Sequence, residues 1–421
     1  MGATQQPVKH LIFIERIASL QDGVASSTSA RAGLLALRLV DTWMRAGAMA
    51  LSDNTQLERS TRRELAEMPG VSAIRGALEN LLDAMRGAAE TDRRPAGIAL
   101  VEYGAALQRA GEWALALDVY DTIIEHLDVA DNSHVVVDAM NRRGACLRDL
   151  GRIDEAALSY NDATELARRG ASVRGQLEAR IGLGKLAYLR GNLPLGERML
   201  TDTARLAEES SLGDVRSVAL HELAAVSFAR GQYHAALRFG YAALQGATEL
   251  SLRERILGDL ASSFVMLGVR AAARDAFLIL AFTAEENVLR SACMINLMEL
   301  AAADGNRVEF DDYRRRLTGA DLSPAFRTQF ELHAGRSYQM LGERDEADPW
   351  IVRALERACT HEFNQLIFAC ENAIAVTSTL TDQRAPAPAS VVPNDIESIV
   401  ADLRSLRELA LIGCEHRGEL D

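Results

Sequence analysis

Apolar residues in the N-terminal region recur every three or four positions, which is the spacing of one face of an α-helix. The first such pattern covers residues 26–46, with serines at its start and a glycine after its end. A second helix, capped by Ser52 or Asp53, is expected to end before Pro69. A third is expected over residues 71–85, where all large apolar positions keep helical spacing. The pattern predicts helices and no strands before the middle of the chain.

A longer pattern then begins, in which a small residue is followed seven positions later by glycine and five positions after that by a second small residue. The glycines of its seven phrases are Gly111, Gly151, Gly191, Gly231, Gly268, Gly305 and Gly342. They are separated by three steps of 40 residues and then three of 37. Glycine tolerates the left-handed backbone angles that end a helix, and small residues let two helices cross closely. The pattern predicts seven helix pairs. Met298 and Phe310 replace the small residues of the sixth pair, which predicts a wider crossing or a shifted register there.

The phrases GAALQRAGEWALA and GACLRDLGRIDEA carry this small–glycine–alanine spacing most plainly. In this they resemble the tetratricopeptide repeat family, and Tyr120 and Tyr160 fall on the family's aromatic position. The resemblance covers residues 95–358 and implies an all-α, right-handed superhelical solenoid of about seven helical hairpins with helical flanks. Units of 37 and 40 residues exceed the usual 34 and are similar to the long-unit arrays of bacterial regulators.

The flanks of the array are predicted from composition and spacing. Residues 1–94 form either a small helical bundle or degenerate capping repeats, which solenoids need at an exposed end. Residues 359–380 are predicted to be a capping helix, and the proline-containing residues 381–393 a stiff linker. Residues 394–421 contain a last helix whose seam is Ile396, Ile399, Leu403 and Leu406. This seam is expected to fold back onto its own chain, with homodimerisation through it as the alternative.

Charge and composition reduce the classes of partner that the protein is expected to bind. The chain has a net charge of −13 and a pI of about 5.2, which disfavours nucleic-acid binding. Its longest apolar stretch, residues 32–51, contains Arg38, Asp41 and Arg45, so no membrane span is expected. No secretory signal is recognisable at the start, and the five cysteines are scattered and odd in number. We therefore expect a cytoplasmic protein with free thiols.

No catalytic motif is found. The sequence Gly182-Leu183-Gly184-Lys185 lacks both the length and the hydroxyl residue of a phosphate-binding loop. The C-x-H pairs at residues 359–361 and 414–416 have no further ligands at metal spacing. The sequence predicts a protein that is not an enzyme and has no metal and no cofactor.

In the resembled family, the first helices of the pairs line a concave groove. Transferred residue by residue, its groove positions imply a binding site that includes Gln108, Asn141, Arg148, Lys185, Tyr188, His221 and Phe228. The amide of Asn141 could pair with a peptide backbone, and Arg148 and Lys185 with a carboxylate. Tyr188 and Phe228 could hold an apolar side chain. Because these basic groups are few in an acidic chain, an acidic or carboxylate-bearing peptide is the expected ligand.

Another groove position holds an alanine in three units, at Ala105, Ala145 and Ala225, which leaves room for a ligand. The clamp that binds chaperone tails needs lysine and asparagine where this chain has Val101 and Ala105. Binding of chaperone tails is therefore not expected.

These observations predict a non-catalytic scaffold or adaptor that binds a protein or an extended peptide in its groove. The alternative is a peptide- or ligand-gated regulator with residues 1–94 as its effector module, since the layout resembles that of the Rap-type peptide receptors of signalling bacteria. An enzyme carried by the N-terminal helices and a pure self-assembly module are the remaining alternatives.

Overall fold

The structure is a computed structural model of the whole chain, described here for residues 9–19, 24–46, 55–70, 72–87, 92–284, 287–320, 322–361, 363–379 and 394–418. These residues form helices and connecting turns, with no strand among them. The chain divides into two compact units, Met1–Val215 and Arg216–Asp421, which are treated separately below. No helix in the described ranges is long and apolar enough to cross a membrane.

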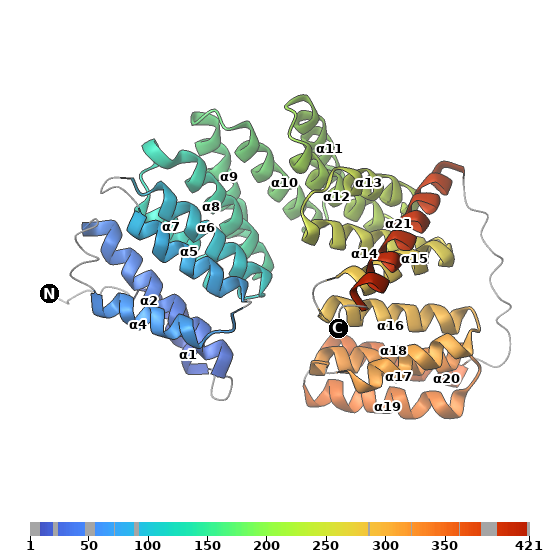
Figure 1. The fold of residues 1–421 in the computed structure, drawn as a ribbon. Coiled ribbons are helices and arrows are strands. Elements are labelled where there is room, and N and C mark those ends of the chain that lie inside the picture. Colours follow the sequence, from blue (N-terminus) through green and yellow to red (C-terminus); the bar gives the residue numbers. More distant parts are fainter. Residues whose placement is uncertain are drawn as a thin grey trace. The chain divides into compact units, whose positions relative to one another are not determined.

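In its described residues, the first unit has four helices that precede the repeats, followed by three helix pairs (Figure 1). The helices before the repeats are α1 (Leu11–Ser19), α2 (Val24–Ala46), α4 (Thr55–Glu67) and α5 (Ala73–Gly87). The pairs are α6 (Arg94–Arg109) with α7 (Trp113–His126), α8 (Val129–Asp149) with α9 (Ile153–Arg169), and α10 (Val173–Leu189) with α11 (Leu193–Glu209).

Nearly all of the second unit is also built from helix pairs. Their bounds are α12 (Gly213–Ala229), which begins at the end of the first unit, with α13 (Tyr233–Gly246), α14 (Leu250–Met266) with α15 (Arg270–Thr283), α16 (Asn287–Ala303) with α17 (Arg307–Gly319), and α18 (Pro324–Met340) with α19 (Arg344–Thr360). Two further helices follow, α20 (Asn364–Thr379), which packs on α18 and α19, and α21 (Asn394–Gly418).

The turn inside each helix pair confirms the predicted role of glycine. All seven predicted glycines have positive φ angles, from 70° at Gly305 to 80° at Gly342. At Gly111, the next amide, that of Glu112, donates back to the carbonyl of Leu107, which ends α6 and turns the chain. The positive φ of Gly305 also shows that the register of the sixth pair is correct, although Met298 and Phe310 are both fully buried there.

The small residues work as predicted where two helices cross. A Cβ atom on the predicted Gly144 would lie 2.8 Å from the ring of Tyr160, and one on Gly182, which is not a predicted crossing residue, would lie 2.3 Å from the same ring. The aromatic ring therefore occupies the space that the two missing side chains leave. In the sixth pair, which has Met298 at the crossing, the position of Tyr160 is taken by Arg314.

The change from 40- to 37-residue spacing has a simple structural cause. In the second and third units, α9 and α11 have 17 residues and end beside Ala171 and Ser211, which take positive φ angles. In the shorter units, α13 and α15 have 14 residues and end at the extended residues Ala247 and Ala284, so they are about one helical turn shorter. The first unit differs, because α7 also has 14 residues and the 40-residue spacing is made up by the 21-residue α8.

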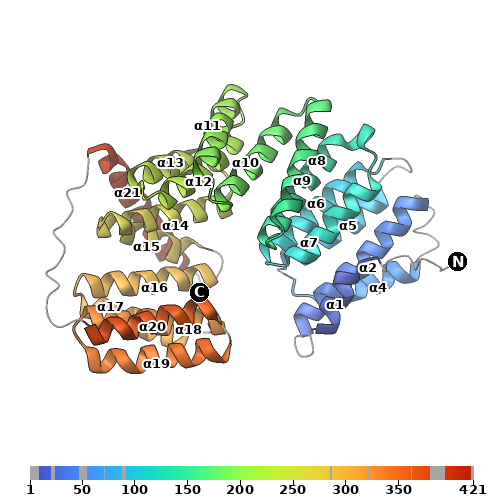
Figure 2. The ribbon, with the colours of Figure 1, turned by 180° about the vertical axis from the view of Figure 1, so that it is seen from behind.

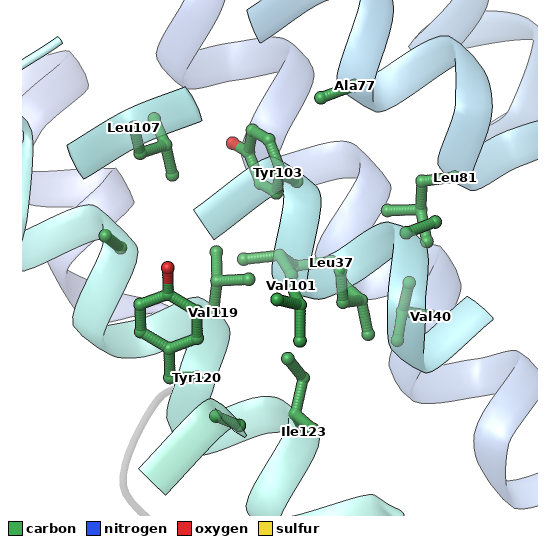
Figure 3. Packing of buried hydrophobic residues seen from close by; sticks show 14 of the residues in the cluster. Leu37, Val40, Ala77, Leu81, Val101, Tyr103, Leu107, Val119, Tyr120 and Ile123 are labelled. Atoms are coloured by element: carbon green, nitrogen blue, oxygen red, sulfur yellow. The ribbon is translucent and has the colours of Figure 1, made fainter. Parts of the chain in front are cut away.

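The helices before the repeats share a hydrophobic core with the first repeats. Figure 3 shows Leu37 of α2 and Leu81 of α5 packed beside Tyr103 of α6 and Ile123 of α7. All four side chains are fully buried. Residue 94 therefore marks the start of the repeats without a break in the core.

Charged side chains, here called the N-terminal clasp, join the segment before α1 to α2 and α7. They are Lys9, His10, Asp41, Asp118, Glu125 and His126. Oxygen Oδ1 of Asp41 lies 2.7 Å from Nε2 of His126, and Lys9 Nζ donates to Glu125 Oε1 at 2.6 Å. Burial acts to raise the pKa of Asp41, but its contacts with His126, His10 and Lys9 outweigh this, so the pKa is lowered. The clasp adds charge pairing to the hydrophobic contact that the fully buried Phe13 of α1 makes with the core.

The last helix, α21, packs on α15 and also touches α13 (Figure 1, and seen from behind in Figure 2). Three of the four predicted seam residues, Ile396, Ile399 and Leu403, are at most 3% exposed and are here called the C-terminal seam, whereas Leu406 is half-buried. Arg407 Nη1 donates to Oδ1 of the buried Asp275 at 2.7 Å. The helix thus docks on its own chain, as expected from its spacing.

Candidate functional site

The first helices of the three pairs in the first unit form one surface, here called the inner face. Helix α6 contacts α8, and α8 contacts α10, although each pair's second helix lies between them in sequence. This is the face to which the sequence assigned the binding groove. The site below is built on it.

A hollow of about 470 Å³ opens on the inner face where α5, α6 and α8 meet. This inner-face hollow is lined by Ala73, Gly76, Ala77, Asn80, Val101, Glu102, Ala105, Arg109 and Arg142. It exists because the facing side chains of α5 and α6 are small, and a Cβ atom on Gly76 would meet nothing within 4 Å. The prediction that alanine at position 105 leaves room is consistent with this hollow. A volume of this size falls in the range of ligand pockets.

The charges around the hollow are of two kinds. Arg142 is paired, since its Nε donates to Asp138 Oδ1 at 2.8 Å. Glu102 and Arg109 are exposed, and neither side chain has a hydrogen bond or ion pair with any described residue. They lie seven residues apart on α6, about 10 Å along the helix axis. The hollow therefore offers one cation and one carboxylate to a ligand.

Farther along the inner face, the charges neutralise one another. Arg174 donates to both carboxylate oxygens of Asp214, at 2.6 and 3.0 Å, and lies 3.4 Å from Glu178. Burial and the nearby carboxylate of Asp138 raise the pKa of Glu178. Glu102 and Arg109 of the first repeat therefore differ from Arg174 and Asp214, which are paired with each other.

The seven residues predicted from the sequence are divided between the two units. Five lie on the inner-face helices of the first unit: Gln108 on α6, Asn141 and Arg148 on α8, and Lys185 and Tyr188 on α10. His221 and Phe228 lie on α12, in the second unit. None of the seven lines the inner-face hollow.

Several of these predicted residues are held by their own chain. Gln108 Oε1 accepts from the hydroxyl of Tyr120 at 2.7 Å. The amide of Asn141 donates to the carbonyl of Gly175 at 3.2 Å, and its buried Oδ1 has no partner in the described part of the chain. Arg148 donates to both oxygens of Asp149, at 2.8 and 3.0 Å. Lys185 and Tyr188 are half-buried on α10.

The two predicted residues of the second unit also have partners within that unit. His221 Nε2 lies 2.8 Å from Oδ2 of Asp259, on α14. The ring of Phe228 packs edge-on against Tyr233, with centroids 5.3 Å apart. The role of all seven residues in binding stays a prediction.

Sequence reasoning missed Gly76, Asn80, Glu102, Arg109 and Arg142. Two of these come from α5, which lies outside the repeats and was not assigned to the groove. The others occupy positions next to the transferred ones, so a transfer of groove positions alone could not find them. The one available signal was Gly76, a glycine inside an otherwise regular helical pattern.

The described residues hold no cluster suited to a metal ion, since no three or more His, Cys, Asp or Glu side chains converge. Burial raises the pKa of both the Cys146 and the Cys293 thiol to about 12. Such thiols stay protonated near neutral pH, so neither has the properties of a nucleophile.

Comparison with known proteins agrees with this architecture. Residues 96–169 match the family model of the tetratricopeptide repeat. A search of curated protein sequences finds no match.

Solved structures with a similar fold include a Rap protein complexed with Competence and Sporulation Factor, at 12% identity and a TM-score of 0.48. That comparison covers 81% of this chain and 99% of the Rap chain. The apo form of the quorum sensor NprR from B. thuringiensis is 14% identical, with 76% and 97% covered and a TM-score of 0.39. A tetratricopeptide repeat protein from Parabacteroides merdae is 12% identical, with 74% and 98% covered and a TM-score of 0.38. These likenesses concern the fold alone.

Proposed function

We propose that this protein is a non-catalytic scaffold that binds an extended segment of a partner protein, or a peptide, on the inner face of its first unit. The observation that carries the proposal is the inner-face hollow with its two unpaired charges. Its uncharged lining residues are small apolar ones, which suit a small apolar side chain, together with Asn80. Arg109 suits an acidic residue or a terminal carboxylate of the ligand.

The expected preference for an acidic partner rests on Arg109 in this proposal. Arg148 was one of the predicted basic contacts, but its guanidinium already faces the carboxylate of Asp149. Arg109 faces no acidic group of the described chain, so a ligand carboxylate would not have to displace one. A cytoplasmic location is part of the proposal and is supported by the free thiols of the described cysteines.

The test is a selection of peptides on the full-length chain, with a variant that fills the hollow. Gly76→Leu adds a side chain into open space on an exposed helical position, so it should fold normally. Peptides selected on the wild type should bind this variant at least about tenfold more weakly, because the added side chain occupies their site. The matched control is Gly319→Leu, at another exposed glycine with open space around it. Equal binding to the wild type and to Gly76→Leu would place the ligand elsewhere.

The charge preference needs its own measurement. Replacing the acidic residue of a selected peptide should weaken binding to the wild type by about fivefold and should leave binding to Arg109→Gln unchanged. Arg63→Gln, at an exposed arginine of α4, is the control. Equal losses on the wild type and on Arg109→Gln would exclude Arg109 as the partner of that residue.

A second candidate function, a peptide-gated regulator, is supported by one specific observation. Helix α5 lines the hollow and belongs to the helices before the repeats, so a ligand there would contact both parts of the first unit. Bound peptide should then change amide exchange in α2 and α4, which do not line the hollow. Protection confined to α5, α6 and α8 would favour the simple scaffold.

A further inference from the structure

A second hollow, of about 470 Å³, lies among α1, α2 and α4 and is separate from the inner-face hollow. We call it the bundle hollow. Its walls are formed mainly by Ile14 and Ile17 of α1 and by Leu34 and Leu35 of α2. Ile14 and Ile17 are three residues apart and lie on one face of α1, whereas Leu34 and Leu35 are adjacent residues of α2 that both line the hollow. Leu35 and both isoleucines are only half-buried, so the described residues leave this apolar wall partly uncovered.

One side of the bundle hollow carries a satisfied ion pair. Arg31 Nε donates to Oε2 of Glu64 at 2.9 Å, and its other nitrogens donate to Ser27 Oγ at 2.6 Å and Thr28 Oγ1 at 3.2 Å. The charges of Arg31 and Glu64 therefore cancel. Neither group is available to a ligand without breaking these contacts.

The other charged group at the bundle hollow, Arg38, is different. It lies two helical turns after Arg31 on the same face of α2, about 10 Å along the axis. Its guanidinium is exposed and has no hydrogen bond or ion pair with any described residue. The hollow is thus an apolar trough with one unpaired cation at its edge.

We propose that the bundle hollow binds a free medium-chain carboxylic acid, with the acyl chain against the Ile and Leu walls and the carboxylate at Arg38. The apolar walls favour a hydrocarbon chain, because covering them removes apolar surface from water. The unpaired arginine selects an anionic end group over a neutral or cationic one. The volume of the hollow suits a small molecule.

The test is a fluorescence titration of the full-length protein with dansyl-labelled undecanoic acid, followed by displacement with dodecanoate or dodecanol. The labelled acid should bind, and dodecanoate should displace it about fivefold more effectively than dodecanol does. Arg38→Gln should weaken the labelled acid about fivefold and should remove the advantage of dodecanoate over dodecanol. Leu35→Gln should weaken both competitors, because both place an acyl chain on that wall.

Two controls separate this site from the rest of the surface. Arg59→Gln changes an exposed arginine of α4 and should leave binding unchanged. Gly76→Leu fills the inner-face hollow and should also leave it unchanged, so this test does not depend on the proposed function. Circular dichroism should show that Arg38→Gln and Leu35→Gln remain folded, as expected for one exposed and one half-buried position outside the core cluster.

Three results would overturn the proposal. The first is no binding of the labelled acid to the wild type. The second is binding that neither Arg38→Gln nor Leu35→Gln weakens. The third is displacement of the probe by an anionic amphipathic peptide but not by dodecanoate, which would assign the hollow to a protein partner.

Discussion

The first and the last described helix are attached to their units with different shares of charged and apolar contact. In the first unit, the N-terminal clasp holds the segment before α1 to α2 and α7 with Asp41, two histidines and Lys9. In the second unit, the C-terminal seam holds α21 to α15 with Ile396, Ile399 and Leu403. A charged attachment depends on pH and on each partner's charge, whereas an apolar seam depends mainly on buried area. The substitutions and conditions that weaken the packing of α1 should therefore differ from those that weaken the packing of α21.

The largest effect is expected at the C-terminal seam. Leu403→Asp places a carboxylate at a fully buried position in place of an apolar side chain. The docking free energy of α21 should fall by at least about 3 kcal/mol, the size of losing a buried leucine. Hydrogen exchange followed by mass spectrometry should then show amides of α21 exchanging about a hundredfold faster.

Leu409→Asp is the matched control, because Leu409 lies on the same helix and is 65% exposed. It should leave exchange in α21 unchanged. If Leu403→Asp gave the same small effect, the buried seam would not be what holds the helix.

The next largest effect is expected at the clasp. Asp41→Asn keeps the shape of the side chain but removes the negative charge that faces His10, Lys9 and His126. Breaking one partner of a largely buried cluster should destabilise the packing of α1 on α7 by about 2 kcal/mol. Amides of α1 should exchange about thirtyfold faster, while those of α21 should not change.

The control for the clasp is Asp83→Asn, at an exposed carboxylate that lies 3.5 Å from Arg62. Exposed pairs contribute little, so a change of at most about 0.5 kcal/mol is expected. An effect equal to that of Asp41→Asn would mean that burial of the clasp adds nothing.

Only one of these two attachments could be predicted from the sequence. The C-terminal seam is local, since Ile396, Ile399 and Leu403 recur at helical spacing within eight residues. The clasp joins Asp41 to His126 across 85 residues and His10 to Asp118 across 108. Single charged residues so far apart leave no periodic pattern, so nothing in the sequence pointed to their meeting.

The same reasoning applies to the rest of the molecule. The seven turn glycines and the small residues at the helix crossings were predicted, because a repeat shows each constraint several times. The inner-face hollow was found only in part, through Ala105. It depends on α5 facing α6 and α8, and residues from outside the repeat follow no repeated pattern.

The pH dependence of stability is a third way to distinguish the N-terminal clasp from the C-terminal seam. Contacts lower the pKa of Asp41, and the hydrogen bond from Lys9 lowers that of Glu125. A carboxyl group with a lowered pKa contributes stability above its unfolded pKa, and this stability is lost as the pH falls through its folded value. Protection of α1 should therefore fall as the pH drops below about 4. The basic groups that face Asp41 are Lys9, His10, Arg45 and His126.

The acid experiment includes its own internal reference. Protonated Asp41 carries no charge, so exchange in α1 of the wild type should converge with that of Asp41→Asn as the pH falls. The variant should show a smaller change over the same pH range, retaining only the contribution of Glu125. Parallel curves for the two proteins would show that Asp41 does not carry the pH dependence.

The smallest effect is expected at the polar edge of the C-terminal seam. The Tyr241 hydroxyl on α13 donates to Asp402 of α21 at an exposed position. Burial and the neighbouring Asp402 raise the pKa of Tyr241, so the phenol stays protonated near neutral pH and can keep donating. Tyr241→Phe removes this bond and leaves both ends open to water, so α21 should lose at most about 0.5 kcal/mol of docking free energy. Exchange in α21 should rise less than about threefold. A loss close to that of Leu403→Asp would show that polar contacts, as at the clasp, also hold this end.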